Sequence, residues 1–182
     1  MSEAIVEIDL KPYLGKKASK ETTEVIAEEI LNFIVERTKK GKGMDGEKFP
    51  SYSTEYKKSD AFKLGGKTNK VNLTLSGEML DSIEIIKADN GKISYGYSES
   101  NEMMGRAEGN ITGSYGKPQG NSSKARRFLD ISPKELAKIC GAIGELPESV
   151  QQKISKAAKQ GAVDIVERFN FEVDYVPPKE EE

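Results

Sequence analysis

Two long segments with helical periodicity, one near each end of the chain, enclose a middle built from short strand-like runs. Within residues 19–40, Ile26, Ile30 and Ile34 recur every four residues and therefore share one face of a helix. A second helix is predicted over residues 147–169, where apolar residues again follow a helical spacing. Each helix has an apolar face that another element must cover.

Short segments with the sequence pattern of strands are expected to pack on these apolar helix faces. Apolar and polar residues alternate in residues 4–10 and again in 71–75, as in a half-buried strand. Residues 83–97 predict a hairpin, because Asn90-Gly91 between two apolar runs signals a tight turn. A last strand is expected at 171–175. We therefore predict an α+β fold: two long amphipathic helices packed on a small, mostly antiparallel sheet, with long flexible loops.

Helix starts are marked by capping residues. Ser132-Pro133-Lys134-Glu135 has the pattern of a capping box, in which the Ser hydroxyl and the Glu carboxylate each satisfy a backbone N–H of the first turn. Ser19 is predicted to cap the first long helix and Ser76 a short one. A further short helix is predicted over residues 54–59.

The chain is predicted to form one domain over residues 1–176, followed by an acidic tail, residues 177–182, that we expect to be disordered. Residues 41–70 and 98–125 are poor in apolar residues and predict loops. A loop as long as the second one needs either disorder or a binding role to explain it. The N-terminus lacks the features of a signal peptide, and no segment approaches the ~20 apolar residues that cross a bilayer. We expect no membrane association, and synthesis in the cytoplasm.

Few residues suggest catalysis. The chain has no His, so the usual general base and zinc ligand is missing. Its single cysteine, Cys140, cannot form a disulfide within one chain. Residues 61–68 nearly match a phosphate-binding loop, but neither the strand before it nor the helix after it is predicted. We expect no cofactor and no metal, and an enzyme built on carboxylates stays a third hypothesis.

Positive charge is concentrated in residues 104–127, called here the basic loop. It contains five basic residues and a single acid, Glu108. The basic residues are Arg106, Lys117, Lys124, Arg126 and Arg127. Two interpretations are open: a disordered loop kept soluble by its charge, or a loop that contacts DNA or a partner protein.

Phe128 and Leu129 follow the basic loop and are predicted to anchor it. The apolar pair would insert into the core, while the guanidinium groups of Arg126 and Arg127 face outward.

Three motif stretches occur in a fixed order through the middle of the chain. The first runs from Gly43-Met44-Asp45-Gly46 through Phe49-Pro50-Ser51-Tyr52-Ser53 to Lys57. The second is Leu75-Ser76-Gly77-Glu78-Met79-Leu80-Asp81-Ser82-Ile83, and the third is Arg126-Arg127-Phe128-Leu129-Asp130-Ile131-Ser132. In this order and spacing they resemble the virion morphogenesis (tail completion) proteins of tailed bacteriophages, over roughly residues 37–140. The chain departs from the family at Arg106-Ala107-Glu108-Gly109, where a His-x-Gly step is common.

The resemblance implies a structural subunit of a neck or tail-completion (terminator) ring, active in tail completion and head–tail joining, and no enzyme. Such subunits form closed rings at the head–tail junction or the head-proximal end of the tail, typically hexamers. The implied partners are further copies of this chain, neighbouring neck, connector or tail-tube proteins, and DNA that passes through the lumen without sequence specificity. The implied location is the virion, after synthesis in the host cytoplasm.

Within such a ring the basic loop would face the lumen or a partner. Residues 104–125 are then expected to be mobile in the free subunit and to gain contacts on assembly. The alternative function is a small nucleic-acid-binding module that uses the same loop, with an affinity for DNA that falls as salt rises.

Overall fold

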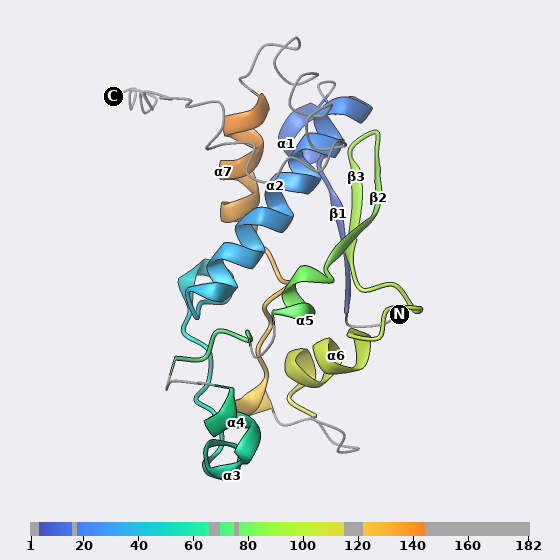
Figure 1. Ribbon diagram of the computed structural model, residues 1–182. Helices are drawn as coiled ribbons and strands as arrows, with labels where there is room; N and C mark the ends of the chain where they lie inside the picture. Colours follow the sequence, from blue (N-terminus) through green and yellow to red (C-terminus); the bar gives the residue numbers. More distant parts are fainter. Residues whose placement is uncertain (1–3, 16–17, 66–69, 75–76, 115–121, 145–182) are drawn as a thin grey trace, which may run out of the picture.

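Three antiparallel strands form a sheet in the order β1-β3-β2 (Figure 1). They are β1 (Ile5–Asp9), β2 (Glu84–Asp89) and β3 (Lys92–Gly96). The computed structural model describes residues 4–15, 18–65, 70–74, 77–114 and 122–144. The hairpin is the predicted one: Asn90 and Gly91 have φ values of 44° and 83°, both positive as a two-residue hairpin turn requires.

The strand β2 forms one edge of this sheet and contains a bulge. Its register against β3 shifts between Ile85 and Lys87. The intervening Ile86 is 44% exposed, although Ile85 pairs with the buried Tyr95. The bulge therefore places an apolar side chain on the outside of the molecule.

The helix α2 (Lys20–Lys39) packs on the sheet, and α7 (Pro133–Gly144) packs on α2 (Figure 1). Ser19 caps α2 as predicted, since its hydroxyl accepts the Thr22 N–H at 3.2 Å. The expected row of Ile26, Ile30 and Ile34 is fully buried. The coarse α+β fold with a small antiparallel sheet is thus confirmed, with α2 as the long helix of the described residues.

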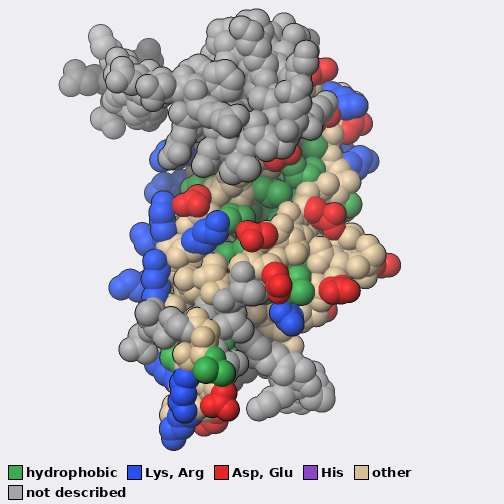
Figure 2. All heavy atoms as spheres, viewed as in Figure 1, with side chains coloured by type: hydrophobic (Ala, Val, Ile, Leu, Met, Phe, Trp, Pro, Cys, Tyr) green, Lys and Arg blue, Asp and Glu red, His purple; other side chains and the backbone are tan. Residues whose placement is uncertain are grey.

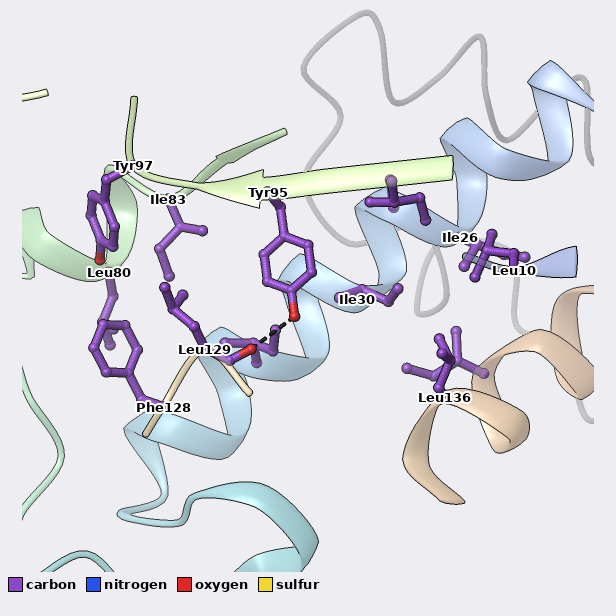
Figure 3. Packing of buried hydrophobic residues seen from close by; sticks show 14 of the residues in the cluster. Leu10, Ile26, Ile30, Leu80, Ile83, Tyr95, Tyr97, Phe128, Leu129 and Leu136 are labelled. Atoms are coloured by element: carbon purple, nitrogen blue, oxygen red, sulfur yellow. Dashed lines mark hydrogen bonds between the residues drawn. The ribbon is translucent and has the colours of Figure 1, made fainter. Parts of the chain in front are cut away.

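The core lies between the sheet, α2 and α7 (Figure 3). Tyr95 points from β3 toward α2, and its hydroxyl donates a hydrogen bond to the Leu129 carbonyl at 2.8 Å. Phe128 lies beside Leu80 at one end of the cluster, and Leu136 comes from α7 at the other.

Short elements complete the described chain. They are α1 (Lys11–Leu14), α3 (Thr54–Lys58), α4 (Asp60–Leu64), α5 (Glu78–Asp81) and α6 (Met104–Thr112), with 3-10 turns η2 (Met44–Gly46) and η3 (Ser122–Lys124). The predicted helix over 54–59 is α3, capped by the Ser53 hydroxyl. The predicted helix after Ser76 is α5, but its N-cap is Gly77. Among the described helices none is long and apolar enough to cross a membrane.

Other predictions of local structure are wrong. Residues 60–64, expected to lie in a loop, form α4. The alternating residues from Val71 form no strand, because the Asn72 side chain accepts the Thr74 N–H and Leu73 takes a positive φ of 55°. These contacts turn the chain before it can extend. Residues 104–112, expected to be part of a mobile loop, form α6, in which Ala107 and Ile111 are buried. The predicted helix 147–169, the strand 171–175 and the acidic tail 177–182 lie outside the described residues.

Candidate functional site

The third motif stretch, Arg126–Ser132, passes through the centre of the molecule between α6 and α7 (Figure 1). Phe128 and Leu129 are 0% and 1% exposed, so their predicted burial is confirmed. The backbone of this stretch is held at both ends: the Arg126 N–H donates to the Asn110 carbonyl at 2.7 Å, and the Leu136 N–H donates to the Ser132 carbonyl at 2.9 Å. Two buried arginines fix it further.

Arg126 points inward, contrary to the prediction that its guanidinium faces outward. The residue is only 4% exposed. Its Nη1 donates to Asn110 Oδ1 at 3.2 Å, and Nη2 donates to the Pro50 carbonyl at 3.3 Å. The guanidinium also lies over the Tyr52 ring, 5.3 Å from its centroid. Burial lowers the pKa of Arg126 from its ordinary value, and these acceptors and the ring compensate for the lost hydration.

Arg37, near the C-terminus of α2, is the second buried arginine. Its Nη1 donates to Glu135 Oε2 at 2.8 Å, and Nη2 donates to the carbonyls of Phe128 and Asp130 at 3.0 and 2.6 Å. The guanidinium also lies 5.4 Å from the centroid of the Phe33 ring. One side chain thereby connects α2, the third motif stretch and the first turn of α7.

Glu135 and Ser132 form the predicted capping box at the start of α7. The Glu135 N–H donates to Ser132 Oγ at 3.1 Å, and the Ser132 N–H donates to Glu135 Oε2 at 3.0 Å. The box also binds the turn η2: Ser132 Oγ donates to Asp45 Oδ1 at 2.7 Å, and the Asp45 N–H donates to Glu135 Oε1 at 3.0 Å. The cap therefore joins the first motif stretch to the third.

This arrangement brings together the Ser132 hydroxyl and the carboxylates of Asp45 and Glu135, and the contacts of these groups show their role. Glu135 accepts two backbone N–H groups and one guanidinium, while Asp45 accepts the Ser132 hydroxyl. These are the bonds of a helix cap and an interelement clamp. Within the described residues no group of His, Cys, Asp or Glu side chains could hold a metal ion.

An aromatic cluster lies beside Arg126, at the end of the molecule formed by α3 and α4 (Figure 1). The rings of Tyr52, Tyr56 and Phe62 have centroids 5.2 to 5.7 Å apart, with tilted or edge-to-face packing. The two tyrosines pack against each other and against Phe62, a partner that the sequence did not suggest. Residues 60–64, which include the start of the near-match to a phosphate-binding loop, form α4 directly after α3 and not a loop after a strand.

Among the described residues, the other members of the basic loop do not converge on one surface. Arg106 is exposed on α6, with Nη1 4.0 Å from Glu78 Oε2. Arg127 faces outward as predicted, with Nε 3.3 Å from Asp130 Oδ2. Lys124 is half-buried in η3, and Lys117 lies outside the described residues.

Sequence reasoning missed Arg37, although a signal for it was present. Arg37 and Thr38 continue the row of Ile30 and Ile34 at spacings of three and four residues, which places them on the buried face of α2. A polar residue on such a row predicts a buried polar partner elsewhere.

Comparisons with protein-family models, with curated proteins and with solved structures find no match to this chain.

Proposed function

We propose that this chain is a structural subunit of a bacteriophage neck or tail-completion ring, in which copies of it close a ring at the head–tail junction and take part in tail completion and head–tail joining. In the finer fold that goes with this proposal, the second long helix, residues 147–169, packs with α2 on the sheet. The expected partners are further copies, as a hexamer, and the neighbouring neck, connector or tail-tube proteins.

One observation carries the proposal: the three motif stretches, distant in sequence, pack against one another. Asp45 of the first stretch binds Ser132 of the third, and the Pro50 carbonyl accepts from Arg126. The second stretch joins them in two ways: Leu80 belongs to the same core cluster as Phe128 (Figure 3), and Asn110, whose carbonyl accepts the Arg126 N–H, donates to Met79 Sδ at 3.8 Å. The residues that carry the resemblance thus form one connected unit, as expected if their order reflects a common fold.

The contacts inside this unit suit a protein that works through its shape. Two buried arginines and a capping box connect segments that would otherwise be separate loops. Such connections hold a subunit rigid, and a closed ring requires every copy to present its two interfaces at the same angle. The proposed location is accordingly the virion, at the head–tail junction or the upper tail.

The alternative, a nucleic-acid-binding module built on the basic loop, has less support from the described contacts. Arg126 is buried against Pro50 and Tyr52, and Arg106 and Arg127 each have a carboxylate within 4.0 Å. Arg126 is therefore poorly placed to neutralise a phosphate, and nearby carboxylates offset part of the charge of the exposed Arg106 and Arg127.

Electron microscopy tests the proposal directly. The full-length chain carrying a short peptide label should be located by reconstruction of phage particles that contain it. We expect density for a ring of this chain next to the portal or the upper tail. A particle in which the label occupies no site near either would overturn the proposal, as would turnover of a substrate by the purified subunit. DNA affinity of the free subunit that falls steeply with salt would favour the alternative.

A further inference from the structure

We propose that two oppositely charged surfaces of this chain form the contact between neighbouring copies, with the acidic face of one copy docking on the basic edge of the next. The acidic face comprises α5, the first half of β2, the loop 98–103 and α6. The basic edge comprises the end of α2, the segment 40–48 and the exposed side of α7. The contact between copies does not depend on the proposed function; only the closing of the copies into a ring rests on it.

The acidic face is continuous across elements that are separate in sequence. Its acids are Glu78, Asp81, Glu84, Glu99, Glu102 and Glu108. The Ser98 N–H donates to Glu84 Oε1 at 3.1 Å, and Asn101 Nδ2 donates to the Ser82 carbonyl at 3.0 Å, which fixes the loop against α5 and β2. Arg106 is the only basic residue in this part of the described chain.

The hydrogen bonds from Ser98 also stabilise the charged form of one of these acids. They hold the pKa of Glu84 below its ordinary value. Glu84 is exposed on the first half of β2, next to the bulged and exposed Ile86.

The basic edge is continuous because a β-bridge and the hydrogen bonds of Asp45 hold its segments side by side. Its lysines are Lys39, Lys40, Lys42, Lys48, Lys134 and Lys138, all exposed. Lys42 and Lys48 lie opposite each other in an isolated β-bridge, and the clamp between Asp45 and the first turn of α7 brings this segment beside Lys134. Three exposed acids lie among them: Glu36, which is 3.9 Å from Lys40, Asp45, which is bound to Ser132, and Glu47.

The two surfaces lie on different sides of the molecule. In Figure 2, Lys and Arg side chains line the edge formed by α2 and α7, whereas Asp and Glu side chains gather over α5 and α6. A contact between different surfaces of identical chains is heterologous, so each copy can bind one neighbour on each side. Each surface also has an exposed apolar side chain, Met44 on the basic edge and Ile86 beside the acidic face, at 37% and 44% exposure. An apolar contact within a charged rim is the usual composition of an interface core.

A second copy fits these surfaces better than DNA does. The basic edge alone would attract any polyanion, but the acidic face would repel DNA, and the chain has a net charge of −2. A further copy of the same chain supplies a complement to both surfaces at once. It also matches opposite potentials across the contact, which steers association and fixes its register.

The proposal is tested by reversing the charge of each surface in a separate variant and then mixing the two variants. One full-length variant carries Lys134→Glu and Lys138→Glu, and the other carries Glu99→Lys and Glu102→Lys; all four residues are exposed. The matched control carries Lys20→Glu and Lys92→Glu, two exposed lysines outside the basic edge. Circular dichroism shows whether each variant is folded. Sedimentation velocity at ~50 mM salt measures the self-association of each protein. The same measurement on an equal mixture of the two reversal variants shows whether their altered surfaces bind each other.

We expect the unaltered chain and the control to associate, and the association constant to fall at least ~10-fold when salt is raised. Each reversal variant alone should associate at least ~10-fold more weakly, while their mixture should recover most of the association because opposite charges again face one another. The proposal is overturned if the unaltered chain stays monomeric at ~1 mM, if the reversal variants associate like the control, or if the mixture is no better than either variant alone.

These outcomes can be separated from those of the proposed function. A ring found in the phage neck with no effect of the charge reversals would remove this interface and leave the function. If the mixed variants recover association but phage particles contain no copy near the portal or upper tail, the interface stands and the proposed function is removed.

Discussion

The guanidinium of Arg37 and the carboxylate of Glu135 are 98 residues apart in sequence and 2.8 Å apart in the structure. Their side chains are 5% and 12% exposed, so this is a buried ion pair. The pair fixes the end of α2 to the first turn of α7, while the second amino group of Arg37 binds the carbonyls of Phe128 and Asp130. A single side chain therefore positions the third motif stretch between two helices.

Replacing Arg37 by Met should strongly destabilise the protein. It leaves the Glu135 carboxylate and two carbonyls without their cationic donor, and breaking a buried pair costs ~3–5 kcal/mol. Chemical denaturation measures the loss. The control is Lys40→Met, because the exposed pair of Lys40 with Glu36 at 3.9 Å should contribute less than ~1 kcal/mol. Equal losses in the two variants would contradict the role assigned to Arg37.

Phe128 and Arg127 offer a test with adjacent residues. Phe128→Ala should lower the free energy of unfolding by ~3–5 kcal/mol, because the side chain is fully buried and its loss opens a cavity in the core. Arg127→Ala should change it by no more than ~0.5 kcal/mol, because the side chain is 71% exposed. Thermal unfolding of the two variants compares them, and similar melting temperatures would show that the third motif stretch is misplaced.

Replacing either of two glycines by alanine should change the free energy of unfolding, in opposite directions for the two positions. Gly96 has a φ of 141°, and an added Cβ would clash with the carbonyl of Ala4, the residue before β1, so Gly96→Ala should cost at least ~1–3 kcal/mol. Gly105 is in α6 with nothing near the position of a Cβ, so Gly105→Ala should stabilise by ~0.5–1 kcal/mol. Urea unfolding distinguishes the two. A gain from Gly96→Ala would mean that β1 and β3 are not paired as described.

The buried thiol of Cys140 predicts a pH dependence of stability. Burial raises its pKa to about 11. The thiol is protonated in both states below a pH of ~8.5, so its full contribution to stability is present there. As pH rises from ~8.5 to 11 the unfolded chain loses this proton first, and stability falls by up to ~1.4 kcal/mol per pH unit.

A comparison with Cys140→Ala isolates this contribution. The stability of the unaltered chain relative to the variant should decline between pH ~8 and ~10, because the remaining titrating groups are common to both proteins. Denaturation at several pH values measures the difference. A difference that stays constant with pH would show that the thiol titrates equally in the folded and unfolded chain.

The parts of the fold that the sequence predicted are those that local chemistry decides. The capping box at Ser132 and the hairpin at Asn90-Gly91 depend on residues within four positions of each other, and both form as predicted. The long helix α2 also follows from its own apolar spacing.

The parts that were missed depend on distant partners. In α6, Gly105, Gly109 and Asn110 are poor helix formers, so the helix is formed because Ala107 and Ile111 are buried in the core. The inward orientation of the Arg126 side chain could not be predicted, because its acceptors, Pro50 and Asn110, lie 76 and 16 residues away in sequence. Charge density alone does not distinguish a basic residue that binds a partner from one that holds two loops of its own chain together.

The bulge at Ile86 has a consequence for how copies of this chain can meet. An uninterrupted outer strand offers a row of backbone groups on which a foreign strand can be added, and that addition can repeat without limit. A strand whose hydrogen-bonding register slips at its centre, with Glu84 before the slip and Lys87 after it, is a poor template for such growth. Association through this side should therefore use side chains, which can specify a finite assembly and disfavour fibres.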